Sequence, residues 1–224
     1  MKNFTLGKRL CAVASFVRDG AVVADIGTDH AYLPIYLVSS GIASGAVASD
    51  IKDGPANCAR DNVRRFMLED KIEVRVADGL CGIEKYKPTD IVICGMGGEL
   101  IADIIDASEY VKNEDIRLVL QPMTSIKELR SYLSNGFFTI DENIAEEDGK
   151  LYQVICARYD GKKRNYTEAE LELGKENIRK RGELFEKLLN LAIAKKRKAI
   201  DGQRLGGRDV SELENELKEL EELR

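Results

Sequence analysis

The sequence predicts an α/β fold: a mostly parallel β-sheet covered by helices on both faces, followed by a helical C-terminal part. Short segments rich in Val, Ile and Ala alternate with helix-length segments over residues 21–134, which is typical of parallel strands joined by crossover helices. Charged segments with leucine at heptad spacing follow from residue 167 onward. With 44% hydrophobic and 33% charged residues among 224, the chain can bury one substantial core and carry an appendage.

Each expected strand is an apolar run bounded by turn residues. The six runs that alternate with helices span residues 21–26, 45–51, 72–78, 90–96, 117–122 and 152–159. The last run pairs with residues 137–145 in an antiparallel hairpin, because Asp148-Gly149 between them is a favoured tight turn. The sheet is therefore expected to be parallel except for this C-terminal strand pair.

Four helices are expected between the strands. They span residues 32–40, 55–68, 99–107 and 125–134. Pro55 fits the first turn of the second helix, where a backbone N–H would have no helical partner in any case.

A different pattern begins near Gly161, so the expected domains are residues 1–160 and 161–224. Residues 167–200 are predicted to form one long charged helix with a heptad repeat. Its apolar positions are Leu171, Ile178, Phe185, Ala192 and Ala199, with Leu184, Leu188 and Leu191 beside them. A glycine-rich breaker precedes a second apolar seam at Val210, Leu213, Leu217 and Leu220. Two such helices joined by a short turn predict an antiparallel coiled coil.

Composition narrows the class of protein. No apolar run reaches the ~20 residues of a membrane-spanning helix, and the N-terminus lacks a signal-peptide cleavage pattern. The expected location is therefore the cytoplasm, without a membrane. The cysteines Cys11, Cys58, Cys81, Cys94 and Cys156 form no Cys-x-x-Cys pair and are expected to be core residues. With a single histidine, no metal site is expected.

The segment VVADIGTDHAYLPIYLV begins as a strand and ends as a helix. Its turn contains Asp25, Gly27, Thr28, Asp29 and His30. Such a turn places backbone N–H groups and a helix N-terminus at the carboxyl edge of the sheet, and Gly27 lets a ligand approach the backbone. A ligand site here competes with the simpler interpretation of an ordinary strand-to-helix turn.

The next strand ends favour the ligand site. Asp50 ends the second strand, Asp78 ends the third, and Gly95-Met96-Gly97 ends the fourth. Because the carboxyl ends of parallel strands meet at one edge, these residues are expected to line one crevice. An acid at the end of the second strand commonly accepts hydrogen bonds from ribose hydroxyls.

Two types of ligand fit such a crevice, a dinucleotide and S-adenosylmethionine. A dinucleotide would need a Gly-x-Gly-x-x-Gly loop for its pyrophosphate, yet Asp29 and Tyr32 stand where further glycines would follow Gly27. Carboxylates would also repel a pyrophosphate, whereas they attract the sulfonium and ammonium groups of S-adenosylmethionine. The acidic turn therefore favours S-adenosylmethionine over a nicotinamide cofactor.

Several motifs together resemble the bacterial tRNA (adenine(22)-N1)-methyltransferases. They are DIGTDHAYLPIYL, ICGMGGELI, LVLQP and EEDGKLYQVI, with LGKRL near the N-terminus. The resemblance spans essentially the whole chain. It implies a Rossmann-like class I methyltransferase domain that uses S-adenosylmethionine, followed by a coiled-coil domain that helps to hold tRNA. The implied reaction is methylation of N1 of adenine 22.

The resemblance also implies roles for the residues at the strand ends. Asp25 would line the methionine end of the donor, Asp50 its ribose, and Asp78 its adenine amino group. The other residues of the expected donor site, including the strand-four loop that faces the target base in this class, are Gly27, Thr28, Ile51, Gly79, Gly95, Met96 and Gly97.

Two further features bear on the target atom. The fourth strand lacks the Asn/Asp-Pro-Pro-aromatic motif of adenine N6-methyltransferases, so an exocyclic amine is less expected than a ring nitrogen. Met123 follows Gln121-Pro122, where the family often has asparagine, which argues against a side-chain amide role at that position.

The expected chemistry depends more on positioning than on proton transfer. Adenine N1 has a free lone pair at neutral pH, so it can attack the donor methyl without prior deprotonation. The product is cationic, and Asp29 is the first candidate to stabilise that charge. His30 could hydrogen-bond the base or a phosphate, and Tyr32 could stack on the unpaired base. Both side chains could instead be purely structural.

Binding of tRNA is expected from local clusters of cations, because the net charge is −5. Residues 158–208 carry 15 Lys or Arg against 8 Asp or Glu, a surplus that attracts phosphates. The candidate RNA-binding residues are Arg9, Lys162, Lys163, Arg164, Arg179, Lys180, Arg181, Lys195, Lys196, Arg197 and Lys198. Each cluster taken singly could also be no more than a solvated helix face.

Two other functions stay open on the sequence alone. The chain could methylate a small molecule or a protein and use the coiled coil for dimerisation, or it could be a non-catalytic tRNA-binding or chaperone protein with a vestigial donor pocket. Turnover without RNA would indicate the first, and absent donor binding the second. The coiled-coil seam could close on itself or on another chain, so a monomer or a weak dimer is expected.

Overall fold

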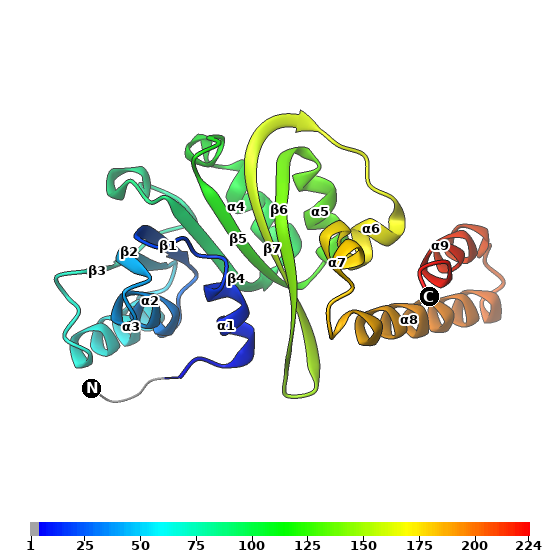
Figure 1. Ribbon diagram of the computed structural model, residues 1–224, viewed down its shortest axis with the longest axis horizontal. Coiled ribbons are helices and arrows are strands. Elements are labelled where there is room, and N and C mark those ends of the chain that lie inside the picture. The colour runs from blue at the N-terminus through cyan, green and yellow to red at the C-terminus, as the bar shows by residue number, and fades with distance from the viewer. Residues whose placement is uncertain (1–4) are drawn as a thin grey trace. The chain divides into compact units, whose positions relative to one another are not determined.

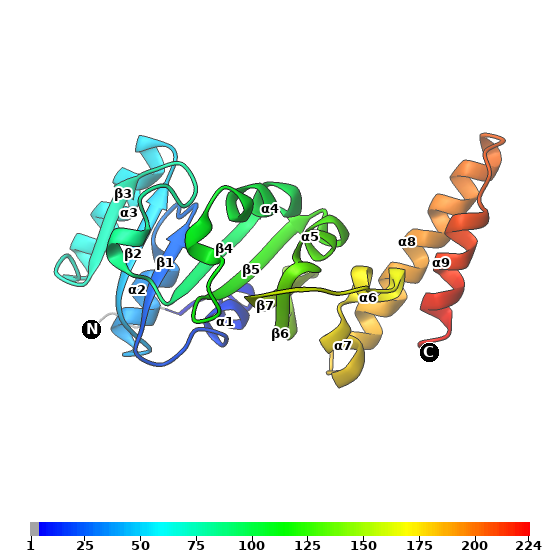
Figure 2. The same ribbon diagram turned by 90° about the horizontal axis from the view of Figure 1, so that it is seen from above.

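The computed structural model describes residues 5–224 and divides the chain into two compact units (Figure 1, Figure 2). The first unit ends at Lys163, and the second runs from Arg164 to Arg224. The division falls slightly beyond residue 160 because the last strand of the sheet, β7 (Lys150–Lys163), continues to Lys163.

The first unit is built on a seven-stranded sheet, counted over residues 5–163, with the strand order β3-β2-β1-β4-β5-β7-β6. The strands besides β7 are β1 (Ala21–Ile26), β2 (Ala43–Asp50), β3 (Ile72–Val76), β4 (Asp90–Gly97), β5 (Arg117–Thr124) and β6 (Asn135–Glu147). The strands β1 to β5 pair in parallel, whereas β7 runs antiparallel to both β5 and β6. The predicted α/β class and the antiparallel strand pair are confirmed.

The helices of the first unit, in its described residues, include one that the sequence did not predict. They are α1 (Lys8–Ala14), α2 (Tyr32–Ser39), α3 (Asp53–Arg65), α4 (Gly98–Asp106) and α5 (Ile126–Leu133), with single 3₁₀ turns at Glu84–Tyr86 and Glu109–Val111. The helix that was missed is α1, because seven residues are too few to show a helical period.

The two faces of the sheet bury separate apolar layers, because successive side chains of a strand point to opposite sides. Val92 and Val119 belong to the layer that contains residues of α1, α2 and α3. Their strand neighbours Ile91, Ile93 and Leu118 belong to the layer that contains residues of α4 and α5. Strands buried on both faces have continuous apolar sequences, which is why β4 and β5 were recognisable.

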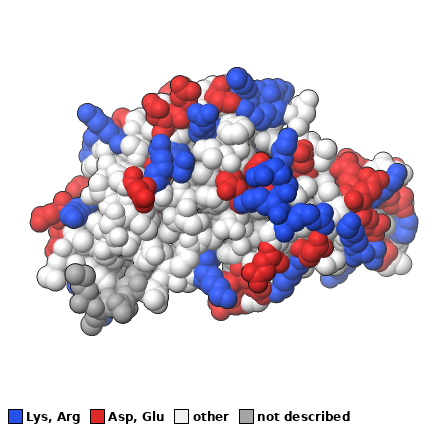
Figure 3. Space-filling view, viewed as in Figure 1, with Lys and Arg blue, Asp and Glu red and all other residues white. Residues whose placement is uncertain are grey.

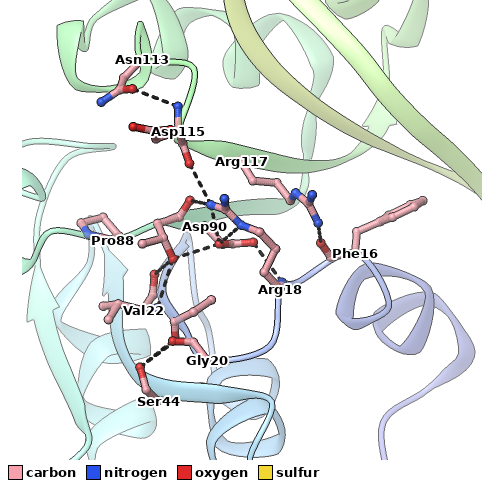
Figure 4. Close-up of polar contacts among 12 residues, drawn as sticks. Phe16, Arg18, Gly20, Val22, Ser44, Pro88, Asp90, Asn113, Asp115 and Arg117 are labelled. Atoms are coloured by element: carbon pink, nitrogen blue, oxygen red, sulfur yellow. Dashed lines mark hydrogen bonds and ion pairs between the residues drawn. The ribbon is translucent and has the colours of Figure 1, made fainter.

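A polar cluster fixes the amino-terminal end of β4 (Figure 4). Asp90 is fully buried, and its carboxylate accepts hydrogen bonds from the Arg18 backbone N–H at 3.1 Å and from Arg18 Nε at 3.0 Å. Thr89 Oγ1 lies 3.0 Å from the same carboxylate, and Arg18 Nη2 donates to the Asp115 carbonyl at 2.9 Å. The cluster thereby ties together the segments that enter β1, β4 and β5.

The second unit contains four helices over residues 164–224. They are α6 (Glu168–Leu173), α7 (Lys175–Lys180), α8 (Phe185–Leu205) and α9 (Ser211–Glu221). The prediction of one helix over residues 167–200 was wrong. The chain leaves helical geometry at Gly174, with φ +89°, and at Arg181, with φ +46°, directly before Gly182. Glycine permits such turns at little steric cost, so the segment is divided there.

The helices α8 and α9 form an antiparallel hairpin (Figure 2). Arg204 pairs with Glu214, and Arg197 Nη2 lies 2.6 Å from Glu221 Oε1. Later residues of α8 thus meet earlier residues of α9, which is the order that an antiparallel pair requires.

The apolar stripe of α8 differs from the predicted heptad. Ala199, a predicted heptad position, is exposed, and Leu191, which was predicted to lie beside the heptad positions, is 56% exposed. The buried residues are Phe185, Leu188, Leu189, Ala192, Ile193 and Ile200, which include the predicted Phe185, Leu188 and Ala192 and lie along one face of the helix. The helical hairpin is therefore observed, whereas a coiled coil stays a prediction.

Candidate active site

The carboxyl ends of β3, β2, β1 and β4 lie along one edge, because these strands are parallel neighbours in the sheet. All residues predicted to bind the donor lie in or directly after the last residues of these strands. They are Asp25, Gly27 and Thr28 from β1, Asp50 and Ile51 from β2, Asp78 and Gly79 from β3, and Gly95, Met96 and Gly97 from β4. The structure brings them to one edge, and their contact with a donor stays a prediction.

The turn after β1 joins three strand ends. The N–H groups of Gly27 and Thr28 both donate to the Ser49 carbonyl at 2.8 Å, and the Ala31 N–H donates to Thr28 Oγ1 at 3.1 Å. Gly27 has φ +77°, which strains any residue with a Cβ atom, and a Cβ there would also require the flexible end of the Met96 side chain to move, because it would lie 1.9 Å from Met96 Cε. The sequence suggested that the N–H groups of this turn face a ligand, but these three are engaged within the protein.

Asp25 is the buried acid of the site, with a relative exposure of 7%. Burial raises the pKa of this carboxyl from its ordinary value of 3.8 to about 6, while a hydrogen bond with the Thr28 side chain acts in the opposite direction. Among residues 5–224, no basic side chain forms an ion pair with Asp25. A buried carboxyl of this kind attracts a cationic group of a ligand.

The second half of the turn forms a polar chain of side chains. Asp29 Oδ2 lies 3.2 Å from His30 Nε2, and His30 Nδ1 lies 2.9 Å from Cys58 Sγ on α3. A carboxylate can only accept, so in the neutral imidazole Nε2 carries the hydrogen and Nδ1 accepts from the Cys58 thiol. The ring of Tyr32 stacks on that of His30, with 5.1 Å between centroids.

Three side chains in the second half of this turn are exposed to solvent. The side chains of Asp29 and His30 are 69% and 42% exposed, and Tyr32 is 40% exposed, so all three can be reached by a substrate. Cys58, expected only as a core residue, was missed as a partner of His30. No sequence signal linked two residues 28 positions apart.

The ends of β2 and β3 combine acids with exposed apolar side chains. Asp50 Oδ1 accepts the Lys52 N–H at 2.9 Å, which fixes the carboxylate. Ile51 and Val76 are 60% and 39% exposed, and Asp78 is also exposed. An adenosine group can use both features, because its flat base packs on apolar side chains and its hydroxyl and amino groups donate to carboxylates.

Arg9 lies at the same edge, although the sequence assigned it to RNA. Its Nη1 donates to Gln121 Oε1 at 2.6 Å, and its guanidinium carbon lies 5.7 Å from the centroid of the Tyr152 ring. Gln121 is fully buried in β5 and was missed as a site residue. A polar side chain inside the apolar run LVLQP was the available signal for it.

Comparison with known proteins identifies the family. Residues 6–155 match a family described as "Methyltransferase domain". The tRNA (adenine(22)-N(1))-methyltransferase of Bacillus subtilis is 46% identical over 158 residues, which cover 70% of this chain and 66% of that protein, just under two thirds of its length. The crystal structure of the B. subtilis M1A22 tRNA methyltransferase TrmK is 36% identical, with a TM-score of 0.82 over 98% of this chain and 96% of that chain. The chain belongs to the tRNA (adenine(22)-N1)-methyltransferase family.

A second family structure contains the donor. It is that of Streptococcus pneumoniae Sp1610, described as a putative tRNA (m1A22) methyltransferase in complex with S-adenosyl-L-methionine. It is 32% identical, with a TM-score of 0.85 over 98% of this chain and 99% of that chain. The family fold therefore extends over both the sheet unit and the helical unit.

Arg9 lies on α1, and the other candidate RNA-binding cations of this chain form three groups. They are Lys162, Lys163 and Arg164 at the end of β7, Arg179, Lys180 and Arg181 at the end of α7, and Lys195, Lys196, Arg197 and Lys198 on α8. On the face shown in Figure 3, positive and negative side chains are interspersed. Clusters along the sequence are therefore not uniform positive patches on this face.

The group on α8 divides into two pairs of residues. Lys196 pairs with Glu216 and Arg197 with Glu221, so both hold the hairpin together. Lys195 and Lys198 are exposed and form no ion pair within residues 5–224. The sequence treated all four cations alike, whereas the structure leaves two of them available for phosphates.

Within the described residues, none of the helices combines the length and the apolar character needed to cross a membrane. The His, Cys, Asp and Glu side chains of residues 5–224 also form no group of three that could hold a metal ion.

Proposed function

We propose that this chain transfers a methyl group from S-adenosylmethionine to N1 of adenine 22 in tRNA. The observation that carries the choice of donor is Asp25, a buried carboxyl that no basic side chain of the described residues neutralises. The N–H groups of Gly27, Thr28 and Ala31 donate to acceptors within the protein, so these three do not offset the repulsion between Asp25 and a pyrophosphate. Family membership supports the choice of substrate.

The strand ends fit the chemical groups of this donor. Asp25 would accept a hydrogen bond from its ammonium group, Asp50 from its ribose hydroxyls, and Asp78 from its adenine amino group. Ile51 and Val76 offer exposed apolar surface for the adenine ring. S-adenosylmethionine supplies an electrophilic methyl group on a sulfonium.

The protein's task in the reaction is to hold the target base. Adenine N1 lies on the Watson–Crick edge, so the base must leave its pairing and stacking partners before it can react. The exposed ring of Tyr32, held against His30, can stack on the base. The Asp29 carboxylate would then stabilise the positive charge that develops on the adenine ring.

The reaction can be tested on unmodified tRNA. Purified protein is incubated with isotope-labelled S-adenosylmethionine and a tRNA transcript, which is then digested for nucleoside analysis by mass spectrometry. We expect labelled 1-methyladenosine from the adenine 22 transcript and none from a transcript with guanine at that position. Methylation of a protein or a small molecule instead would move the activity to another substrate class. Absence of donor binding would indicate a non-catalytic tRNA-binding protein.

Replacing Asp29 by alanine should lower kcat by about 100-fold, the range seen when one group that stabilises transition-state charge is removed. Donor affinity should change by less than about threefold, because Asp29 is assigned to the base and not to the donor. The measurement is single-turnover methylation together with calorimetric donor titration. Asp61→Ala, which removes an acid of α3 that is 76% exposed, is the matched control. A rate within twofold of wild type would contradict the role of Asp29.

Neutralising Lys195 and Lys198 to glutamine should weaken tRNA binding. The slope of log K against log salt should fall by about one to two, because each phosphate contact contributes slightly less than one. The matched control is Lys196→Gln with Arg197→Gln, which removes two cations that already have acidic partners. Equal slopes for wild type and the Lys195/Lys198 variant would exclude these two residues from the tRNA interface.

We also propose a location, a tRNA-binding domain and an oligomeric state for the protein. We place the protein in the cytoplasm, where its tRNA substrate is found, with residues 161–224 as its tRNA-binding domain. We further propose a monomer or a weak dimer. Sedimentation at micromolar concentration should show the monomer mass, and a tight dimer would contradict this.

A further inference from the structure

Cys58 of α3 lies at one end of a chain of three polar side chains. Its Sγ atom lies 2.9 Å from His30 Nδ1, and His30 Nε2 lies 3.2 Å from Asp29 Oδ2. A nucleophile, a base and an acid that orients the base stand in this order in enzymes that activate a thiol or a hydroxyl group. The methyl transfer proposed above involves Asp29 and His30 but gives the Cys58 thiol no role.

The helix α3 fixes the orientation of the His30 imidazole. Asn62 Nδ2 donates to the His30 backbone carbonyl at 3.0 Å, and Asn62 lies one helical turn after Cys58, on the same side of α3. The Tyr32 ring stacks on the imidazole, with 5.1 Å between centroids. The imidazole thus has contacts at both nitrogens and on a ring face, which keep Nδ1 directed at the thiol.

Cys58 differs from the other cysteines in having both a base and access to solvent. His30 is the single histidine of the chain, and its two ring nitrogens face Cys58 and Asp29, so no other thiol has an imidazole beside it. Cys58 is partly exposed. Burial raises the pKa of the Cys94 and Cys156 thiols, which disfavours their reactive thiolate forms. The other two cysteines, Cys11 and Cys81, are exposed.

We propose that Cys58 is a site of reversible thiol modification by low-molecular-weight disulfides, with His30 as its base. Cys58 Sγ attacks one sulfur of the disulfide, and the thiol proton moves to His30 Nδ1. A new S–S bond forms, the old S–S bond breaks, and the leaving thiolate takes the proton from His30. Cys58 is thereby oxidised and half of the disulfide is reduced to a thiol, so no further oxidant is needed. Asp29 stabilises the imidazolium during the transfer.

Modification of Cys58 should also lower methylation, and this part of the inference rests on the proposed function. The mixed disulfide has no S–H group, so the hydrogen bond to His30 is lost. The attached group adds bulk beside the imidazole on which Tyr32 stacks. Because Tyr32 is proposed to hold the target base, the modified protein should bind that base poorly, and reduction of the disulfide should restore the activity.

The site can be tested with bis(2-hydroxyethyl) disulfide, a small uncharged probe, at pH 7. Intact mass and peptide mapping give the rate at each cysteine. Cys58 should react about tenfold or more faster than Cys81, an exposed thiol without a base. His30→Gln removes the base and should slow Cys58 about tenfold or more, while the rate at Cys81 stays within about twofold. Asp29→Asn should slow Cys58 less strongly, and it provides a second test of the chain of side chains if His30→Gln does not fold.

Three results would overturn the thiol site. They are a Cys58 rate no higher than that of Cys81, an unchanged Cys58 rate in folded His30→Gln, or an unchanged rate in Asp29→Asn. The effect on methylation is measured as the ratio of treated to untreated rates, which should fall about fivefold or more in wild type, recover with dithiothreitol, and stay near one in Cys58→Ser. An equal loss in Cys58→Ser would overturn the link to methylation. Absence of methylation before treatment would instead contradict the proposed function, and the thiol rates would still test the site.

Discussion

Replacing Asp25 by asparagine should stabilise the ligand-free protein above pH 6 and greatly weaken donor binding. The unfolded chain ionises Asp25 near pH 3.8, whereas burial raises the folded-state pKa to about 6. Between these values the folded state holds the extra proton, so the free energy of unfolding falls as pH rises. Above pH 6 the folded protein bears the full free-energy cost of ionising the buried Asp25 carboxyl. Removing this cost should raise the free energy of unfolding by roughly 3 kcal/mol at most.

The same substitution removes the proposed partner of the donor's ammonium group. Loss of a buried charge partner costs about 2–5 kcal/mol, so donor affinity should fall by about 30-fold or more. Wild-type affinity should itself decrease below pH 6, because a proton then competes with the ammonium for Asp25. If only the ionised form binds the donor, the affinity at pH 5 should be about fivefold lower than at pH 6.

Urea denaturation and donor titration at pH 5 and pH 8 measure both effects. The matched control is Asp61→Asn, which changes an exposed acid outside the site and should alter neither quantity appreciably. A stability gain without loss of donor affinity would show that burial of Asp25 only destabilises the fold and that Asp25 does not bind the donor. Loss of stability at pH 8 would show that its carboxylate serves the fold.

Replacing Arg18 by alanine should lower the free energy of unfolding by about 3–5 kcal/mol, the range for leaving one partner of a buried ion pair uncompensated. Asp90 is fully buried, and its carboxylate would lose the guanidinium and keep only the hydrogen bonds from the residue-18 backbone N–H and from Thr89 Oγ1. The hydrogen bond from the Arg18 side chain to the Asp115 carbonyl would be lost as well (Figure 4). Chemical denaturation at pH 7 measures the change.

The reverse substitution provides a graded comparison. Asp90→Ala should destabilise less than Arg18→Ala, because the Arg18 side chain is 38% exposed and can be rehydrated. Arg64→Ala removes an exposed pair with Asp61 and should change stability by less than about 1 kcal/mol. Equal effects of all three substitutions would show that burial does not govern this cluster.

The fold of the first unit could be predicted because local patterns and topology agree. Doubly buried strands have continuous apolar sequences, and Asp148-Gly149 specified the hairpin turn. The helix α1 was missed because it is too short to show a helical period, and its position depends on contacts distant in sequence, such as that between Glu147 and the Arg9 N–H. The helix predicted over residues 167–200 was wrong because the heptad pattern outweighed Gly174, which ends α6.

The site was predictable to the extent that parallel strands share an edge. Asp25, Asp50 and Asp78 could be placed together from their positions at strand ends alone. The contacts of His30 with Cys58 and of Arg9 with Gln121 could not, because each joins residues far apart in the chain. Charge runs were the weakest guide, since Lys196 and Arg197 proved to be partners of α9 acids.

The most direct test of the proposed reaction is to locate the methyl group within the tRNA. A methyl group on N1 blocks the Watson–Crick edge, so primer extension by reverse transcriptase stops at a modified adenine. After incubation with the protein and S-adenosylmethionine, we expect a new stop at position 22 that requires both components. Full-length extension through position 22, or a stop only at another position, would contradict methylation of N1 of adenine 22.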